Sequence, residues 1–462
     1  IGLMIALLGI AMIPSALLDI ADGSEDWHIF LISSAISILI GSGLAVLSGG
    51  APPSTTTREA FLLTTLIWIV LPVIATFPFM SYGMSFTDAM FEAVSGLTTT
   101  GATVMTGLDT TARGILLWRA ILQWIGGIGI IVTAIAILPM LRVGGMQLFQ
   151  IESSDVSGKV LPRITEITAQ TGIVYVIISI ACALSYAACG MSAFDAIAHS
   201  MTTMSAGGYS THDASFAHFS DTPAAYAATV FMFIAGLPFS LLTLLILHGR
   251  WRPMLSFATA IVVWHEAVVD PPIFDHIFHG FRQALFNIIS IMTGTGYASA
   301  PYDTWGEPAV VVFLIATFLG GCAGSAACGI KMFRLEISFK AVLAYAAQIV
   351  RPNRVVRIRY AGRTIPSDTL QSVMVFVFLY MATFVVAAIL ISMTGEDLLT
   401  SISASATSVS NVGPGLGPKI GPSGTFQPLS DMAKWVCLTA MLLGRLEFVA
   451  VFTLLTARFW RG

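Results

Sequence analysis

Charge is what this 462-residue sequence lacks most. Only 10% of its residues are Asp, Glu, Lys or Arg, against roughly 25% in an average globular domain. The five cysteines are an odd number and fall mostly in apolar sequence, so we interpret them as buried apolar residues and not as a disulfide framework. A phosphate-binding GxxxxGK(S/T) loop is missing as well, which excludes an ATPase of that type. Together these absences argue against a soluble enzyme.

Long apolar runs take the place of charge. The mean hydropathy is +0.85, and runs long enough to cross a bilayer, about 20 residues each, recur along the chain. We predict membrane spans at 3–18, 29–47, 61–80, 115–140, 173–190, 224–247, 308–320 with 335–350, 371–393 and 432–456, and a short one near 255–270. The polar and apolar alternation of membrane barrel strands is absent. The sequence therefore predicts an all-α polytopic membrane protein.

Basic residues cluster in a few connections between these spans. Eight of the 22 Lys and Arg lie between Lys331 and Arg363, and others lie in 142–171, after 224–247 and near the C-terminus. By the positive-inside rule these segments are cytoplasmic. We interpret the basic run as an ordinary cytoplasmic loop between spans and expect no nucleic-acid partner.

Four short segments align with one another without gaps, at 88–101, 195–208, 283–296 and 400–413. Each copy has a small residue at its second position, hydroxyl residues six and three positions before its end, and glycine at the end. The aligned columns are Ala89, Ala196, Ala284 and Ser401; Ser95, Thr202, Ser290 and Thr407; Thr98, Ser205, Thr293 and Ser410; and Gly101, Gly208, Gly296 and Gly413. Four coincident columns indicate an internal fourfold repeat.

Each segment lies between two apolar spans, although the preceding span is weak in the third copy. Ten to fifteen residues are too few to cross a bilayer and suit a re-entrant helix. Non-helical backbone at that depth is tolerated only where it lines a water-filled cavity or is buried in protein. We therefore predict four span–pore helix–span repeats around one pseudo-tetrameric pore, plus two extra N-terminal spans. The predicted division is 1–57 for the N-terminal spans and 58–141, 142–250, 251–350 and 351–462 for repeats one to four.

The glycine-ended strips suit the passage of a cation. Rings of backbone carbonyl oxygens replace a hydration shell without fixed charge, and glycine supplies the backbone angles that aim them. Each preceding helix also points its negative end towards the pore. The hydroxyls three residues before each glycine either add oxygen ligands or hold the loop in place. The predicted filter residues are Thr99, Thr100, Gly101, Ala206, Gly207, Gly208, Gly294, Thr295, Gly296, Asn411, Val412 and Gly413.

Acidic residues flank the strips but do not lie within them. Asp109, Asp213 and Asp303 follow the first three strips, on the outer side. They either concentrate cations at the mouth or are ordinary solvated loop acids. Asp88 and Asp195 open two of the short helices, where a carboxylate suits the N-terminus, and we interpret both as caps.

Seven motifs, taken together, carry a family resemblance that covers about residues 60 to 456. They are SGLTTTGAT (95–103), WRAILQWIGGIGIIVTAIAILP (118–139), GGMQLF (144–149), LFNIISIMTGTGYAS (285–299), LGGCAGSAACGIKMFR (319–334), NVGPGLGP (411–418) and GRLE (444–447). The sequence resembles the Trk/Ktr/HKT superfamily of potassium transporters, specifically the TrkH-type pore subunit. The resemblance implies a pore in each protomer, a homodimer in the lipid of the bacterial inner membrane, and gating by a cytoplasmic nucleotide-binding subunit of the RCK class.

By this resemblance the chain takes up potassium, with K⁺ as the transported ion and no cofactor on the chain, and it is not an enzyme. In HKT-like relatives, serine at the first filter glycine goes with sodium preference, so Gly101 favours potassium. A poorly selective Na⁺/K⁺ channel and a cation symporter of the same superfamily are the alternatives. Rocking secondary transporters commonly carry two inverted repeats, whereas four repeats in the same direction favour a pore.

The resemblance also places a gating loop at 320–329, followed by Lys331, with Arg445 on the permeation path below the filter and in contact with the loop. The small residues of this loop equally favour tight helix packing. A charge within an apolar span is usually functional, but Arg445 is also explained by a salt bridge to Glu447 or another acid. The predicted gate residues are Gly320, Gly321, Gly324, Ser325, Gly329, Lys331 and Arg445.

The sequence also departs from the family pattern in three places. Gly294 stands where relatives usually have Thr, and Ala326 and Cys328 stand where they usually have Thr and Gly. The third departure is 251–280, which does not look like the first span of repeat three. This stretch contains His265-Glu266, His276 and His279, the best support for a membrane-embedded metal hydrolase. The zinc-binding HExxH spacing is missing, because Val269 stands in place of the second His.

Overall fold

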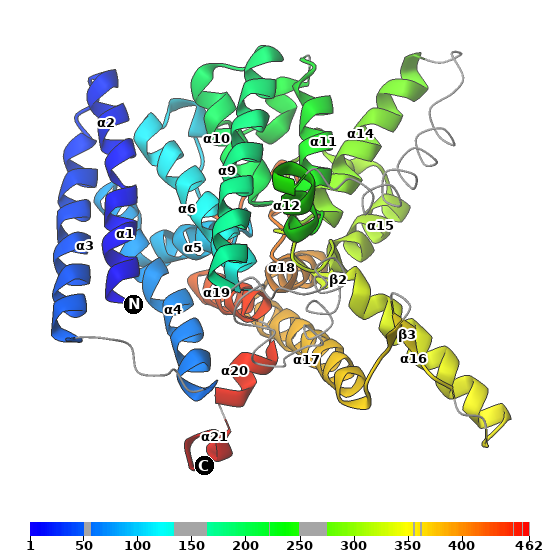
Figure 1. The fold of residues 1–462 in the computed structure, drawn as a ribbon. Helices are drawn as coiled ribbons and strands as arrows, with labels where there is room; N and C mark the ends of the chain where they lie inside the picture. Colours follow the sequence, from blue (N-terminus) through cyan, green and yellow to red (C-terminus); the bar gives the residue numbers. More distant parts are fainter. Residues whose placement is uncertain are drawn as a thin grey trace.

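The computed structural model describes residues 1–49, 57–133, 164–220, 222–248, 275–353, 356–360, 363–446, 448–454 and 456–461. Helices dominate these stretches (Figure 1). Their only strands are two short pairs, β1 (Leu319–Gly320) with β2 (Ile330–Lys331) and β3 (Arg359–Tyr360) with β4 (Arg363–Thr364). The predicted all-α polytopic class is confirmed. The short span expected near 255–270 lies outside the described residues.

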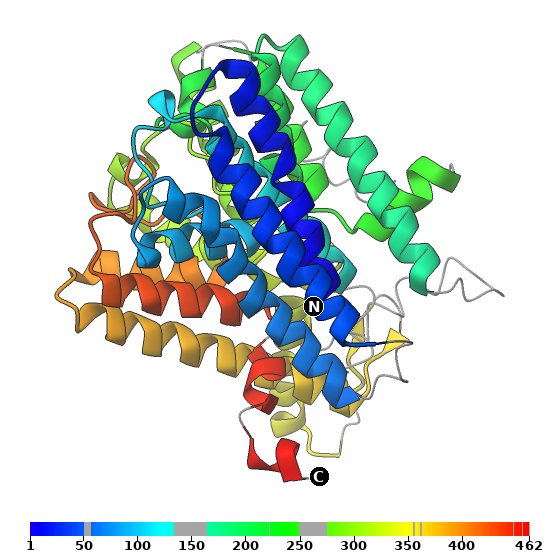
Figure 2. The same cartoon turned by 90° about the vertical axis from the view of Figure 1, so that its left-hand side faces the viewer.

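Three N-terminal helices form the two extra spans, α1 (Gly2–Ala11) with α2 (Ile13–Asp22), and α3 (Trp27–Leu47). They pack along one face of the molecule, in dark blue at the front of Figure 2. A Cβ on Gly41 would lie 2.4 Å from the amide nitrogen of Ala6, so glycine lets α3 approach α1 closely. Asp19 of α2 accepts a hydrogen bond from the backbone N–H of Gly114 at 2.8 Å, which attaches this hairpin to the first repeat.

The first two repeats have the predicted order of span, short helix and span. The first contains α4 (Thr57–Ser81), α5 (Phe86–Leu97), η1 (Leu108–Thr110) and α6 (Arg113–Val132). The second contains α9 (Ile164–Ala188), α10 (Ala193–Met204), η3 (Ser215–Phe219), α11 (Ala224–Ala235) and α12 (Phe239–His248). Helices α5 and α10 have 12 residues each, too few to cross a bilayer.

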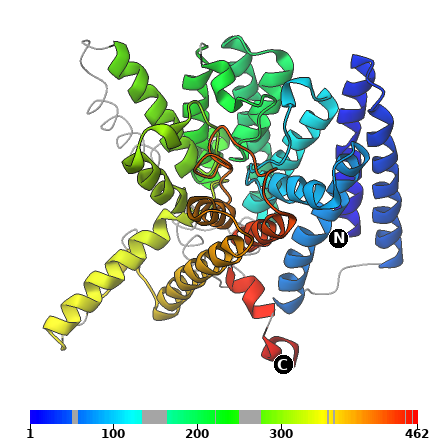
Figure 3. The ribbon, with the colours of Figure 1, turned by 180° about the vertical axis from the view of Figure 1, so that it is seen from behind.

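The fourth repeat follows the same order, whereas the first span of the third lies outside the described residues. The third contains α14 (Asp275–Met292), η4 (Tyr302–Thr304), α15 (Glu307–Phe318) and α16 (Met332–Val350), with β1 and β2 between the last two. The fourth contains α17 (Ser367–Ser392), α18 (Leu398–Ser410), α19 (Asp431–Arg445) and α20 (Phe448–Leu454), and α21 (Ala457–Arg461) ends the chain. Helix α16 extends away from the bundle in Figures 1 and 3. The predicted boundaries at 142 and 251 lie outside the described residues, and the division into repeats stays a prediction.

Six stretches of the described chain are helical, long and apolar enough to cross a membrane. They are Gly2–Asp22, Trp27–Leu47, Phe61–Ser81, Arg113–Val132, Thr168–Ala188 and Ser367–Ser392. Each overlaps a predicted span. The interruption expected between 320 and 329 is present, because α15 ends at Phe318 and α16 begins at Met332.

Two predicted spans are each divided into two helices, a division that was not predicted from the sequence. The span at 224–247 was expected as one helix, but α11 ends at Ala235 and α12 begins at Phe239. Pro238 has no N–H to continue the helical ladder. The span at 432–456 is likewise divided, because α19 ends at Arg445 and α20 begins at Phe448.

Serine, and not aspartate, occupies the cap position of α5 and α10. The hydroxyl oxygens of Ser85 and Ser192 accept the backbone N–H groups of Asp88 and Asp195, each at 3.1 Å. The prediction that the two aspartates are the caps is therefore wrong by three residues. Each carboxylate in turn accepts a hydrogen bond from the hydroxyl of its serine, at 2.9 and 2.7 Å, and its negative charge in the first turn suits the helix N-terminus.

Candidate functional site: a ring of four glycine-ended strips

The four strips that follow the short helices contact one another in cyclic order. Each terminal glycine lies so close to the next strip that an added Cβ would fall against its backbone. The Cβ would lie 2.0 Å from the Gly207 oxygen for Gly101, 1.8 Å from the Thr295 oxygen for Gly208, 2.8 Å from the Gly413 nitrogen for Gly296, and 3.0 Å from the Gly101 oxygen for Gly413. Strip one therefore touches strip two, two touches three, three touches four, and four touches one. The structure brings all twelve predicted filter residues to one closed ring.

The same backbone conformation recurs two residues before each terminal glycine. Thr99, Ala206 and Asn411 each have φ of 53°, and Gly294 has φ of 80°. Non-glycine residues in this left-handed region are uncommon and are enriched at functional sites. Three of the terminal glycines are left-handed too, with φ of 83°, 74° and 79° for Gly101, Gly208 and Gly296.

Gly413 differs from the other terminal glycines, since its φ is not positive. Pro414 follows it, and a proline restricts the residue before it to extended conformations. Glycine is needed at 413 for space and not for a left-handed φ, because a Cβ would meet the backbone of Thr100 and Gly101. The expectation that backbone angles explain all four glycines therefore holds for three of them.

Hydrogen bonds within each repeat fix the strip to its short helix. The carbonyl six residues before each terminal glycine accepts an amide N–H of the strip. The bonds run from Thr100 to Ser95 (2.8 Å), from Gly207 to Thr202 (2.9 Å), from Gly296 to Ser290 (3.1 Å) and from Val412 to Thr407 (2.9 Å). The hydroxyls of the next column also have partners in the chain: Thr98 with Thr100, Ser205 with Thr202, Thr293 with Thr295, and Ser410 with Tyr380. These bonds support the loop-holding role for that column.

Gln123 of α6 holds the second strip from behind. Its Nε2 donates to the carbonyl oxygen of Gly207 at 2.7 Å, and its Oε1 accepts the backbone N–H of Tyr209 at 3.0 Å. The side chain is fully buried, so both of its polar groups need these partners. Repeat one thereby fixes the backbone of repeat two on either side of Gly208. No role for Gln123 was predicted from the sequence.

A buried ion pair lies beside this contact. Arg119 of α6 places Nε 2.7 Å from Oε1 of Glu92 on α5, and both side chains are at most 1% exposed. The same guanidinium donates to the carbonyl oxygen of Ser210 at 3.0 Å and to the hydroxyl of Thr103 at 3.1 Å. It also lies 4.1 Å from the ring centroid of Tyr209. Removing either charge would leave the other buried without its partner, which is costly.

The predicted gating loop is closed at its base by a strand pair. Strands β1 and β2 run parallel, with Gly320 opposite Lys331. A Cβ on Gly320 would lie 2.1 Å from the carbonyl oxygen of Cys328. Gly324 and Gly329 both have φ of 74°, a conformation that favours glycine.

The loop also packs into the break between α11 and α12. Three backbone hydrogen bonds join them: Cys322 to Gly236 (3.2 Å), Ala326 to Ala235 (3.3 Å) and Phe239 to Gly324 (3.0 Å). The carbonyls at the end of α11 are free to accept because the helix stops there. Gly321 lies against the same place, since its Cβ would be 3.1 Å from the Gly236 oxygen. Ser325 donates to the Cys322 carbonyl at 2.7 Å within the loop.

Arg445 joins the loop to the first strip. Its Nη1 lies 2.7 Å from Sγ of Cys328, and its Nη2 donates to the hydroxyl of Thr99 at 2.7 Å. The side chain is 5% exposed, and no hydrogen-bond partner for Nε is found among the described residues. Cys328 also approaches the third strip, because a Cβ on Gly294 would lie 3.1 Å from its amide nitrogen. Glu447, the alternative partner for Arg445, lies outside the described residues.

The acids that follow the strips have partners in the chain. His212 lies between Asp109 and Asp195, with Nδ1 2.5 Å from Asp109 Oδ1 and Nε2 3.5 Å from Asp195 Oδ1. The hydrogen bond from His212 lowers the pKa of Asp109, and hydrogen bonds to Asp195 and Asp109 raise the pKa of His212. Asp213 accepts the backbone N–H of Leu108 at 3.1 Å. These contacts tie the outer loops of the first two repeats together.

Asp303 has a different environment, against the fourth repeat. A Cβ on Gly421 would lie 2.4 Å from its Oδ2. Burial raises its pKa above the ordinary range for an aspartate. This acid is packed between two repeats, and it is not a freely solvated loop acid.

Known proteins resemble the chain over its whole length. A family model described as TrkH, cation transport protein, matches residues 28–261 and 254–460. The chain is 37% identical to the Trk system potassium uptake protein TrkI of Halomonas elongata, over 98% of this chain and 94% of that protein. It is 35% identical to the Trk system potassium uptake protein TrkH of Escherichia coli K12, over 100% and 98%. Its fold matches the crystal structure of the potassium transporter TrkH from Vibrio parahaemolyticus with a TM-score of 0.86 and 32% identity, covering 100% of this chain and 98% of that one.

Proposed function

The chain belongs to the TrkH family of cation transport proteins, and we propose that it takes up potassium through the ring of four strips. It is a multi-pass protein of the bacterial inner membrane, as its apolar helices and its relatives show. The relatives are named potassium uptake proteins. Potassium is accordingly the proposed transported ion of this chain.

The closed ring of strips is the observation that carries the proposal. Four short helices end at it, and the negative ends of their dipoles favour a cation there. Backbone carbonyl oxygens are the ligands that such a filter offers to a dehydrated K⁺. No acidic residue lies in the strips themselves, so selectivity depends on where the backbone is held. The filter residues we propose are the twelve predicted ones, from Thr99 to Gly413.

We further propose that the loop 320–329 and Arg445 form the gate below the filter. The loop contacts Arg445, and Arg445 contacts Thr99 of the first strip. A buried guanidinium at this point repels a cation leaving the ring, because charges interact strongly in a medium of low dielectric constant. Opening then requires the loop to leave the α11–α12 break and Arg445 to move with it.

A cytoplasmic partner is the proposed source of that movement. The names of the relatives place them in a Trk system, which indicates more than one component. We propose a nucleotide-binding regulatory subunit of the RCK class, bound on the side that carries the Lys331–Arg363 basic run. A homodimer in the membrane is the proposed assembly. Both proposals rest on the family resemblance.

Ion flux into liposomes tests the proposed function directly. We expect purified protein in proteoliposomes to pass K⁺ in preference to Na⁺, because the ring presents carbonyl oxygens without fixed charge. Isotope or fluorescence uptake of each ion along a matched gradient measures the ratio. Equal flux of both ions would favour the alternative of a poorly selective channel. Flux that requires a proton or sodium gradient would favour a symporter.

Gln123→Leu tests whether the selectivity of the proposed filter depends on the two hydrogen bonds from Gln123 to the backbone of the second strip. The variant leaves the Gly207 carbonyl and the Tyr209 amide without their side-chain partner, and an unsatisfied buried group costs about 1–3 kcal/mol. We expect the K⁺/Na⁺ flux ratio to fall severalfold while K⁺ flux persists. Gln371→Leu, at an exposed position on α17, is the matched control. An unchanged ratio in Gln123→Leu would show that strip two keeps its shape without this side chain.

A further inference from the structure

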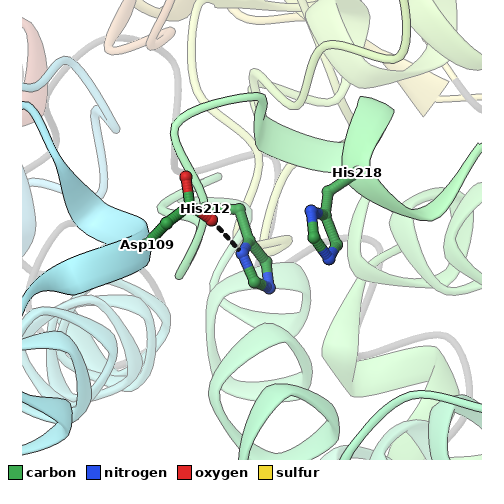
Figure 4. A group of neighbouring side chains, drawn as sticks. All are labelled: Asp109, His212 and His218. Atoms are coloured by element: carbon green, nitrogen blue, oxygen red, sulfur yellow. Dashed lines mark hydrogen bonds and ion pairs between the residues drawn. The ribbon is translucent and has the colours of Figure 1, made fainter.

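We propose that Asp109, His212 and His218 form a binding site for a divalent transition-metal ion at the outer loops of the first two repeats. Among the described residues they are the one group of three or more His, Cys, Asp or Glu side chains with metal-ligand spacing. Figure 4 shows the Asp109 carboxylate and the two imidazole rings gathered at one place. None of the three residues belongs to the proposed filter or gate.

The ligand atoms are nearly in place. One carboxylate oxygen and one ring nitrogen from each histidine lie within 4.8 Å of one another. The imidazole rings of His212 and His218 are stacked with centroids 3.6 Å apart and planes inclined by 3°. A zinc ion bound at about 2.0–2.2 Å to each donor draws tetrahedral ligand atoms to roughly 3.3 Å apart. Ring nitrogens bind a metal in the plane of the ring, so one of the two stacked rings must rotate to face the ion. The exposed position of the His218 side chain allows this rotation.

The central histidine is already oriented as a metal ligand. Its Nδ1 faces Asp109, and its Nε2 lies 3.5 Å from Oδ1 of Asp195. Asp195 is held in turn by hydrogen bonds from Thr211 and Ser192, both at 2.7 Å. A carboxylate behind the second ring nitrogen is the usual support of a metal-binding histidine, since it fixes the ring and its tautomer. Asp195 lies in that position here, at ion-pair distance, while Nε2 has no hydrogen-bond partner among the described residues.

The donor set selects the class of ion. Two imidazoles and one carboxylate suit Zn²⁺, Cu²⁺, Ni²⁺ or Co²⁺, whereas Mg²⁺ and Ca²⁺ prefer oxygen ligands throughout. Asp109 is 50% exposed and His212 is 18% exposed, so an ion reaches the site from solvent and water completes its coordination. Two histidines and an aspartate at the outer side offer nothing specific to K⁺, which the proposed filter binds by carbonyls.

The bound ion would join two loops that lead directly from the ring. Asp109 follows the first strip, and His212 and His218 follow the second. Two hydrogen bonds already join these loops. The backbone N–H of Leu108 donates to the Asp213 carboxylate, and the backbone N–H of Asp213 donates to the Asp109 carboxylate. An ion would tighten this link and place positive charge beside the outer mouth, which lowers the local concentration of cations. This consequence rests on the proposed function, whereas the binding itself does not.

Zinc binding to the purified protein in detergent tests the site without any transport measurement. We expect calorimetric titration with Zn²⁺ to show one more bound equivalent per chain for wild type than for His218→Ala or Asp109→Asn. His28→Ala removes an exposed histidine outside the cluster and is expected to match wild type. Mg²⁺ in large excess is expected not to compete. Two variants are used because His218 and Asp109 lie on different loops, and both side chains are exposed, so neither substitution disturbs the core.

Equal stoichiometry and affinity in all four proteins would overturn the site. The second arm measures K⁺ flux in proteoliposomes with Zn²⁺ added outside. Wild type is expected to lose at least about half of its flux at zinc saturation, and His218→Ala is expected to keep it. Flux inhibited equally in both would overturn the proposed effect at the mouth. A complete absence of K⁺ flux that persists after deletion of residues 322–328, the proposed gate, would count against the proposed function and leave the binding result standing.

Discussion

Gly101→Ser is expected to reduce the preference for K⁺ over Na⁺ by about tenfold, equivalent to about 1.4 kcal/mol. The backbone of Gly101 has φ of 83°, where a residue with a Cβ is strained by about 1–3 kcal/mol. The added Cβ would also lie 2.0 Å from the Gly207 carbonyl oxygen. One of the two strips must therefore move, and the carbonyls that replace the hydration shell move with it.

The measurement is the ratio of K⁺ to Na⁺ flux in proteoliposomes. Gly83→Ser is the matched control, because Gly83 also has a positive φ, of 101°, but nothing lies within 4 Å of its added Cβ. The control separates strain at any left-handed glycine from displacement of the ring. A ratio that stays at the wild-type value in Gly101→Ser would show that Gly101 does not shape the filter.

Displacement of Gly207 in Gly101→Ser is expected to weaken its hydrogen bond with Gln123 as well. Its Nε2 bonds the oxygen that the new Cβ would strike, so a serine at 101 competes with that bond. Combining Gly101→Ser with Gln123→Leu should then lower the selectivity by less than the sum of the two separate effects, since both act on the position of Gly207.

Much of the fold could be predicted from the sequence, because the strongest signals are repeated. Four gapless copies with a shared glycine end predicted four short helices and their order, and the structure closes them into one ring. The family resemblance likewise predicted the interruption between α15 and α16, at a run of small residues that equally favoured tight helix packing. In both cases the physical cause is local: glycine and apolar length determine backbone shape without help from distant residues.

The contacts behind the ring could not be predicted, because they join different repeats. Gln123 and Gly207 are 84 residues apart, and a single sequence contains no record of such pairs. A weaker signal was present, since Arg119 and Gln123 are polar residues within an apolar span, where such groups are costly and usually have a role. The quoted WRAILQWIGG motif contains both residues, but only the fold shows which backbone they hold.

The break between α11 and α12, at residues 236–238, had a signal in the sequence that a hydropathy plot does not reveal. Gly236 and Pro238 are both poor helix formers, yet the apolar run continues on both sides of them and predicts one span. The structural role of the break becomes clear only when the contacts with the third repeat are known. The carbonyls of Ala235 and Gly236, which have no partner within the helix, accept the amides of Ala326 and Cys322 in the predicted gating loop.

Deleting residues 322–328 is expected to raise K⁺ flux severalfold in the absence of any cytoplasmic partner. The deletion removes Cys328, which contacts Arg445 and approaches Gly294 of the third strip. It also removes the three backbone bonds that hold the loop in the α11–α12 break. If the loop is the gate, as proposed, the path below the ring then loses the segment that closes it.

The deletion is compatible with the rest of the fold because its ends are already adjacent. An added Cβ on Gly329 would lie 3.3 Å from Cα of Gly320, so Gly321 can be joined to Gly329 with little movement of β1 and β2. Proteoliposome flux measures the effect, and an unchanged K⁺/Na⁺ ratio in the variant would show that ions still pass the same filter. Flux no higher than wild type would contradict the assignment of the loop as the gate.

Cys328→Ala distinguishes the contribution of the loop from that of the Arg445 charge in the proposed gate. It leaves the loop and its backbone bonds intact but removes the Sγ that lies 2.7 Å from Arg445 Nη1. If the guanidinium itself is the barrier, freeing it from the loop leaves its charge below the ring, and flux stays close to wild type. If the loop closes the path by holding Arg445 against Thr99, the same variant should raise flux partway towards that of the deletion. The contact geometry favours the second outcome. Arg445 is held between two partners, Cys328 of the loop and Thr99 of the first strip, and it must leave Thr99 for the path to open.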